Sequence, residues 1–88
     1  MKIKKGFVLE EVGDSYLACA TGKLVKQFSG YIRLNSTGAF LFRLLCDKDM
    51  TESELVGALT AEYEIDTDTA LKDAAAFVKR LSEAGIIE

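Results

Sequence analysis

The spacing of hydrophobic residues changes near residue 35, and this change divides the chain into two parts. Before that point, hydrophobic residues come in short runs, and Gly-Asp and Ser-Gly pairs beside them are typical of turns. Strands that are close in sequence usually pair with each other, so we expect an antiparallel sheet. Residues 24–28 fit either an extended segment or a loop. The runs that predict β-strands are residues 6–12, 15–20 and 31–34.

After residue 35 the spacing becomes helical. Asn35 or Ser36 can cap a first helix, because a short polar side chain accepts a hydrogen bond from the free amides of the first turn. This helix should run to about Cys46, and it is apolar nearly all round, which is typical of a helix buried at the centre of a domain. Thr51 and Glu54 fit a capping box at the start of a second helix. The residues expected on the buried face of that second helix are Leu55, Leu59 and Tyr63.

A third helix is predicted to begin at residues 65–68, where acidic side chains suit the positive end of the helix dipole. Gly85 suits the left-handed position that ends such a helix, and Ile86 and Ile87 should then return to the core. The predicted fold class is therefore α+β. It consists of a three-stranded antiparallel sheet followed by three helices, in one domain over residues 1–88.

Composition argues against catalysis. The chain has no histidine, which removes the commonest general base and the commonest metal ligand. It also has no CxxC spacing, no glycine-rich phosphate loop and no serine or cysteine beside a plausible base. Cys19 and Cys46 lie in apolar stretches, and we expect both to be small buried hydrophobic residues rather than a disulfide or a metal pair. We therefore expect no enzyme activity, no cofactor and no metal.

Charge and hydropathy restrict the partners. No apolar run approaches the length of a membrane helix, and the basic first residues are followed by too few apolar residues for a secretory signal. A cytoplasmic protein without a membrane partner is expected. The net charge is −3, but residues 1–43 carry +4 and residues 44–88 carry −7. The acidic total argues against tight binding of nucleic acid, whereas the basic half can attract an acidic partner.

The third helix has a wider apolar face than packing against one core requires. At 100° per residue its apolar positions span about 180°, whereas about 100° is enough for a helix that faces one core. One interpretation is that the small domain wraps the helix and buries both flanks. The other is a groove, in which the small Ala74 and Ala76 would let a partner backbone approach closely. The side chains expected in the wall and rim of that groove are Phe77, Ala84, Asp73 and Arg80.

The third strand supports the groove interpretation. An open three-stranded sheet has two edges, and each edge has a row of unpaired backbone groups. A partner segment can pair with an edge as an additional strand, with affinity from main-chain hydrogen bonds and selectivity from side-chain pockets. An edge beside a helix with too wide an apolar face is therefore a candidate site for binding a peptide.

Several segments follow one another in a distinctive order and spacing. Leu34-Asn35 runs directly into the helix S-T-G-A-F-L-F of residues 36–42, and residues 51–63 read T-x-x-E-L-V-x-x-L-x-x-E-Y. They are followed by Asp66, Asp73, Phe77, Leu81 and the closing Gly85-Ile86-Ile87. This pattern resembles the PqqD family, the small peptide-binding chaperones of pyrroloquinoline quinone biosynthesis and of related peptide-modifying pathways. The resemblance covers nearly the whole chain, mostly through structural residues, and residues 22–28 depart from it.

The resemblance implies a winged-helix-like domain that acts as a RiPP recognition element. In such an element the leader segment of a ribosomally synthesised precursor peptide docks along the third strand and against the third helix. The domain then presents the leader to a modifying enzyme, often of the radical SAM type. Relatives act in several pathways, so the resemblance does not imply a particular product. The peptide-binding residues that it implies are Tyr31, Ile32, Arg33, Leu34, Asp73, Phe77 and Arg80.

Two other non-catalytic functions are compatible with the same pattern. Three helices after a sheet can form a winged helix-turn-helix that binds DNA. Residues 67–83 would then enter the major groove of the DNA, but they have no net positive charge to bind its phosphates. The other alternative is a small structural homodimer. Its contacts would be Phe42 and Cys46, on the far side of the first helix.

Overall fold

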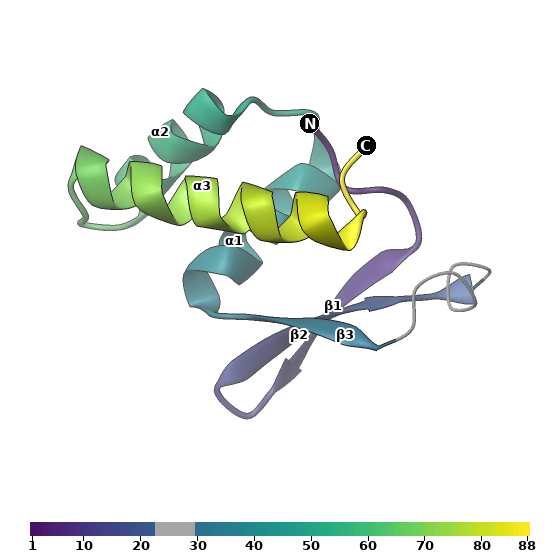
Figure 1. Cartoon of the computed structure of the whole chain (residues 1–88). Helices are drawn as coiled ribbons and strands as arrows, with labels where there is room; N and C mark the ends of the chain where they lie inside the picture. The colour runs from purple at the N-terminus through teal and green to yellow at the C-terminus, as the bar shows by residue number, and fades with distance from the viewer. Residues whose placement is uncertain (23–29) are drawn as a thin grey trace.

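The structure, a computed structural model, describes residues 1–22 and 30–88, and it has the predicted order of strands and helices (Figure 1). The predicted α+β fold, a three-stranded antiparallel sheet followed by three helices, is confirmed, and the winged-helix-like description fits it. Residues 24–28, which fitted either a strand or a loop, lie outside the described residues. The elements are β1 (Phe7–Val12), β2 (Ser15–Ala20), β3 (Tyr31–Leu34), α1 (Ser36–Asp47), α2 (Glu52–Glu62) and α3 (Thr67–Ala84).

The sheet has β2 in the middle, with β1 and β3 antiparallel to it on either side. Among the described strands, β3 is therefore an edge. Alternate residues of a strand point to opposite faces, and Ala18, Ile32 and Leu34 are buried on the face that the helices cover. The helices lie on one side of the sheet in Figure 1. The sheet thus has one face in the core and one face without a helix.

Helix α1 lies at the centre of the domain, as its apolar surface predicted, and it contacts the sheet and both other helices. Asn35 both ends β3 and caps α1, because its side-chain Oδ1 accepts a 2.8 Å hydrogen bond from the Gly38 N–H. A Cβ atom at Gly38 would lie 3.3 Å from side-chain atoms of Leu34 and 3.2 Å from Asn35 Oδ1. The first turn of α1 therefore packs tightly against the end of β3.

The other two helices begin at the predicted places; the capping box of α2 was predicted, whereas the cap of α3 was not. Thr51 and Glu54 form the reciprocal capping box, with hydrogen bonds of 2.9 and 3.1 Å. Asp66 caps α3 by accepting a 2.7 Å hydrogen bond from the Thr69 N–H. Gly85 ends α3 with φ of 78°, a left-handed conformation that glycine adopts at little cost.

The two ends of the described chain pair with each other. Ile3 and Ile87 form an antiparallel bridge, and the Lys4 N–H donates a 2.9 Å hydrogen bond to the Ile86 carbonyl. Ile3 and Ile86 are both buried. The return of Ile86 to the core was predicted, whereas its pairing with the first residues of the chain was not.

The positions of four residues differ, wholly or in part, from what was predicted. Cys46 is exposed near the end of α1, and Cys19 is only half-buried because it points to the face of the sheet that no helix covers. Phe42 is 1% exposed and belongs to the core, so it cannot be a contact of a homodimer. In α2, Leu55 and Leu59 are buried as expected, while Tyr63 caps the helix half-buried and packs edge-on against Phe40.

Asp66 makes the stability of the fold depend on pH. The hydrogen bond from the Thr69 backbone holds the pKa of the Asp66 carboxyl below its ordinary value. A carboxyl with a lowered pKa in the folded state stabilises the fold at neutral pH, and this contribution is lost as pH falls through the folded-state pKa. Asn also accepts a capping hydrogen bond but does not titrate. We therefore expect Asp66→Asn to show a smaller fall in Tm than the wild type between neutral pH and about pH 3.

Asp68→Asn is the matched control, because Asp68 lies in the first turn of the same helix and no described residue donates it a capping hydrogen bond. This control should follow the wild-type dependence of Tm on pH more closely than Asp66→Asn does. Equal acid sensitivity of the wild type and Asp66→Asn would contradict the assignment.

Candidate functional site

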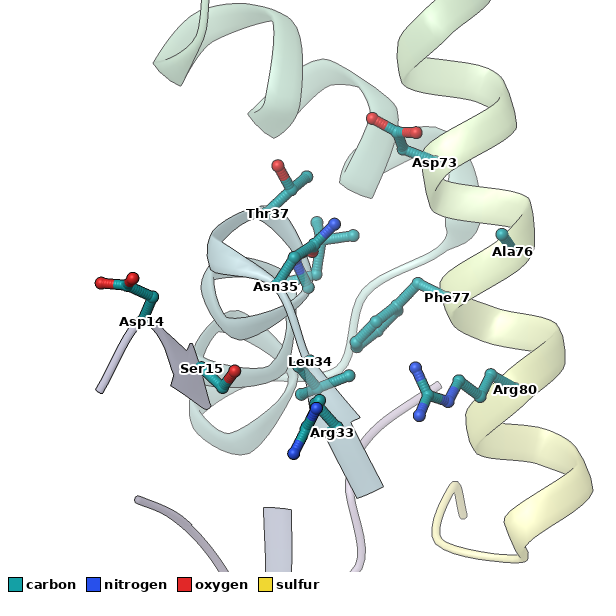
Figure 2. Close-up of a pocket in the computed structure, with 12 residues that line it drawn as sticks. Asp14, Ser15, Arg33, Leu34, Asn35, Thr37, Asp73, Ala76, Phe77 and Arg80 are labelled. Atoms are coloured by element: carbon teal, nitrogen blue, oxygen red, sulfur yellow. The ribbon is translucent and has the colours of Figure 1, made fainter. Parts of the chain in front are cut away.

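A cleft of about 430 Å³ lies between the end of β3, the first turn of α1 and the side of α3 (Figure 2). The two walls come from segments about 40 residues apart in the chain, since β3 ends at Leu34 and the helix wall begins at Asp73. The cleft also borders the free edge of β3. An extended segment placed at this edge would therefore have a hollow beside it for some of its side chains.

The helix wall is one face of α3. Asp73, Ala76, Phe77 and Arg80 follow the i, i+3, i+4, i+7 spacing that puts residues on one side of a helix. In Figure 2, Phe77 points from α3 toward Leu34, with Asp73 and Arg80 on either side of it along the helix. The wall therefore has an aromatic centre between an acid and a base.

The opposite wall is built by the junction of β3 and α1. It contains Arg33, Leu34 and Asn35, and then Thr37 and Gly38 of the first helical turn. Gly38 keeps this wall close to the strand, for the packing reason given above. The floor is apolar, and the rim has charges and hydroxyl groups that can bind polar parts of a ligand.

Five of the seven predicted peptide-binding residues line this cleft. The two that do not are Tyr31, which is exposed on the far face of the sheet, and Ile32, which is buried in the core under β3. Both remain candidates through their backbone groups, because they belong to the same edge strand. The predicted residues that line the cleft are Arg33, Leu34, Asp73, Phe77 and Arg80.

The alanines of α3 divide between the core and the cleft. Ala76 lines the cleft and is exposed, as a close approach of a backbone requires. Ala74 is fully buried in the core, and Ala84 does not line the cleft. Ala74 lies on the side of α3 that packs against the other helices, so its small size serves helix packing rather than the cleft.

Sequence reasoning missed the part of the cleft that α1 and the β1–β2 turn supply. Asp14 and Ser15 line it from the turn, and Thr37, Gly38 and Leu41 line it from α1. The available signal was the absence of any linker between Leu34 and the helix cap, since a helix that starts where a strand ends must present its first turn beside that strand.

Phe77 satisfies both interpretations of the wide face of α3. Its side chain is only 6% exposed and belongs to the core, yet it also lines the cleft. The helix is wrapped on this flank by β3 and α1, and the wrapping leaves a hollow above the ring. The Phe77 side chain therefore packs in the core and also forms part of the lining of the cleft.

The charged residues of the cleft are Asp14, Arg33, Asp73 and Arg80. Within the described part of the chain, no ion pair involves any of them. In Figure 2 both arginines lie below Phe77, and Asp73 lies above it. The described residues contain no group of three or more side chains suited to hold a metal ion. The arrangement can therefore bind a segment that has an apolar side chain and charges.

Phe77→Ala should destabilise the fold by about 3–5 kcal/mol, because it removes a buried aromatic ring and leaves a cavity. Chemical denaturation followed by circular dichroism measures this loss. Leu71→Ala is the control on the same helix, and it should cost much less because Leu71 is 47% exposed. Similar losses in the two variants would show that Phe77 does not support the core.

Comparisons with known proteins agree with the architecture. A solved structure described as "TbiB1 in Complex with the TbiA(beta) Leader Peptide" is similar to this chain, with a TM-score of 0.72 and 25% sequence identity over 100% of this chain and 95% of that chain. No curated protein matches the sequence. No helix in residues 1–22 or 30–88 has both the length and the apolar character that crossing a membrane requires.

The family comparison is the more specific one. The family model described as "Coenzyme PQQ synthesis protein D (PqqD)" matches residues 7–87. This range contains all the named strands and helices and both walls of the cleft. The chain therefore belongs to the PqqD family.

Proposed function

We propose that this chain binds the leader segment of a ribosomally synthesised precursor peptide, without catalysis, and presents it to a modifying enzyme. The observation that carries the proposal is the cleft itself, an apolar hollow beside an unpaired strand edge. An extended peptide can satisfy its own backbone groups on such an edge and bury selected side chains beside it.

The geometry fits strand addition on β3. Helix α3 and the first turn of α1 flank the edge, so a peptide strand there has the sheet on one side and an apolar floor below it. Side chains of a strand alternate between its two faces, so every second side chain of the leader would point toward Phe77 and Leu34. The exposed Ala76 leaves room for such a side chain against α3.

The comparisons support the same proposal. The similar structure named above contains a leader peptide, and the similarity extends over the whole of this chain. The PqqD match covers the residues that build the cleft. On the same basis we propose a modifying enzyme as the second partner, of the radical SAM type in keeping with the family resemblance.

The alternative functions receive less support. A DNA-reading helix needs cations for phosphates, but α3 carries no net positive charge over residues 67–83. The homodimer alternative needs Phe42 as a contact residue, but Phe42 is buried in the core. Neither alternative explains a cleft at the edge of the sheet.

The free charges of the cleft suggest the chemistry of the leader. Arg33 and Arg80 line it without ion-pair partners among the described residues, and the first 43 residues have a net charge of +4. Opposite charges across an interface speed association and help to set the register of a bound segment. We therefore propose that the leader places an acidic side chain at these arginines.

Ala76→Trp should weaken leader binding at least tenfold, because an indole at this exposed position fills the cleft without disturbing the core. The probes are fluorescently labelled synthetic peptides with the N-terminal segments of short open reading frames in the same genomic neighbourhood, and anisotropy measures the Kd of the one that the wild type binds. Amide chemical-shift changes on adding this probe should be concentrated in β3 and α3.

Ala75→Trp is the matched control, because Ala75 is exposed on the same helix but does not line the cleft. It should bind the leader like the wild type, and both variants should have wild-type stability. Equal affinity of the two tryptophan variants, or shift changes away from β3 and α3, would contradict binding in the cleft. A DNA duplex that binds at micromolar concentration with a steep dependence on salt would favour the DNA alternative.

Arg80→Glu should weaken binding of an acidic leader by about three- to tenfold at low salt, since it replaces an exposed attraction by a repulsion. The effect should shrink as salt is raised, because exposed charges are screened. Lys79→Glu makes the same charge change at the neighbouring exposed position outside the cleft, and it should have a smaller effect. If both variants weaken binding equally, only the overall charge matters and Arg80 has no special contact.

A further inference from the structure

The face of the sheet that no described helix covers carries several exposed apolar side chains. Four large hydrophobic side chains are exposed in the described part of the chain, and three of them point to this face. They are Val8, Val12 and Tyr31, which are 40%, 55% and 58% exposed. Leu17 and Cys19 of the central strand point the same way and are half-buried. An exposed apolar face of this kind often marks a site of interaction.

The pairing register arranges this face in rows across the three strands. In one row, Val8 of β1 pairs with Cys19 of β2, which pairs with Tyr31 of β3. Partners in a register point to the same face, so these three side chains lie beside each other. The row is apolar from one edge of the sheet to the other.

The neighbouring row has opposite charges at its two ends. Glu10 of β1 pairs with Leu17 of β2, which pairs with Arg33 of β3. Both charged residues are exposed, and no ion pair involves either of them among the described residues. The apolar leucine therefore separates a free carboxylate on one edge strand from a free guanidinium on the other.

We propose that this face binds the same face of a second copy of the chain, around a two-fold axis that runs along β2. Such an axis places β1 of each copy over β3 of the other. Each Glu10 then faces an Arg33, and each Val8 faces a Tyr31, so charges are matched and a small side chain meets a large one. Leu17 and Cys19 lie on the axis and face their own copies.

The charge pattern is the reason to choose a second copy as the occupant. The second row is antisymmetric about β2, with a negative and a positive end at equal distances from Leu17. A face with this pattern is complementary to itself after a two-fold rotation, which is the symmetry of most homodimers. Packing of two sheets with nearly aligned strands is also a common arrangement.

The area of the face determines how tightly the two copies are expected to bind. Strands spaced about 4.8 Å apart, with β1 and β2 about 20 Å long and β3 about 13 Å long, give a face on the order of 250 Å² in each copy. Stable interfaces bury more than this, so the dimer should be weak and should form only at high protein concentration. The argument for this dimer does not use the proposed leader binding, although Arg33 also reaches the rim of the cleft, so the association is measured without any leader peptide.

Charge exchange tests the proposal directly. Sedimentation equilibrium from micromolar to millimolar concentration should show the wild type rising from the monomer mass of 9.6 kDa toward twice that mass. Glu10→Arg alone and Arg33→Glu alone should each remain monomeric, because each puts like charges opposite each other. An equimolar mixture of these two variants should associate again, since both facing pairs then have opposite charges.

Glu11→Arg is the matched control, because Glu11 is exposed on the same strand but points to the other face. It should associate like the wild type. Circular dichroism should confirm that every variant is folded, as expected for exposed positions. A wild type that stays monomeric at millimolar concentration, single variants that associate normally, or a mixture that stays monomeric would each overturn the proposal.

The position of Cys19 gives a second readout that does not rely on charge. A short bis-maleimide should cross-link Cys46→Ser, which retains Cys19, into dimers at high concentration. It should not cross-link Cys19→Ser, because Cys46 is on α1, on the other side of the sheet. Cross-linking through Cys46 instead would place the contact elsewhere and contradict the two-fold arrangement.

Discussion

The direct passage from β3 into α1 is the constraint on which the rest of the structure depends. Asn35 ends the strand and caps the helix, so no loop separates the two elements. Gly38 then allows the first turn of α1 to approach Leu34 at a distance that a Cβ atom would not permit without adjustment. The junction fixes where α1 lies under the sheet, and α1 in turn provides the surface on which α2 and α3 pack.

The cleft follows from that packing. Helix α3 lies against α1 but does not close completely over the end of β3, and Phe77 occupies the space between them. One aromatic ring therefore completes the core and forms the floor of the site. In a chain of 88 residues, which has little interior volume, this double use places the proposed binding surface directly on the core. We therefore expect a change at Phe77 to alter stability and leader binding together, and changes at the exposed Ala76 and Arg80 to alter binding alone.

The sheet separates two surfaces with different chemistry. Its covered face holds Ile32 and Leu34 in the core, and the edge of β3 opens into the cleft. Its other face shows Val8, Val12 and Tyr31 to solvent. Arg33 connects the two, because it points away from the core and its side chain still reaches the rim of the cleft. A small domain of this kind can present a peptide on one side while another protein surface contacts the opposite side of the sheet.

The sequence by itself determined the elements, because their signals are local. Short hydrophobic runs bounded by turn signals predicted the strands. The caps at Asn35, Thr51 and Gly85 formed as expected, and with the cap at Asp66 they rest on hydrogen bonds between residues only three or four positions apart. Tertiary structure decided what each apolar side chain contacts. It placed Cys46 in solvent and Ala74 in the core, and it paired Ile3 with Ile87 across the whole chain. It also made the wide face of α3 part of both the core and the cleft. The burial of Phe77 depends on how closely β3 and α1 approach α3 in space. These elements lie about 40 residues away in the sequence, and no local pattern encodes a contact over that separation.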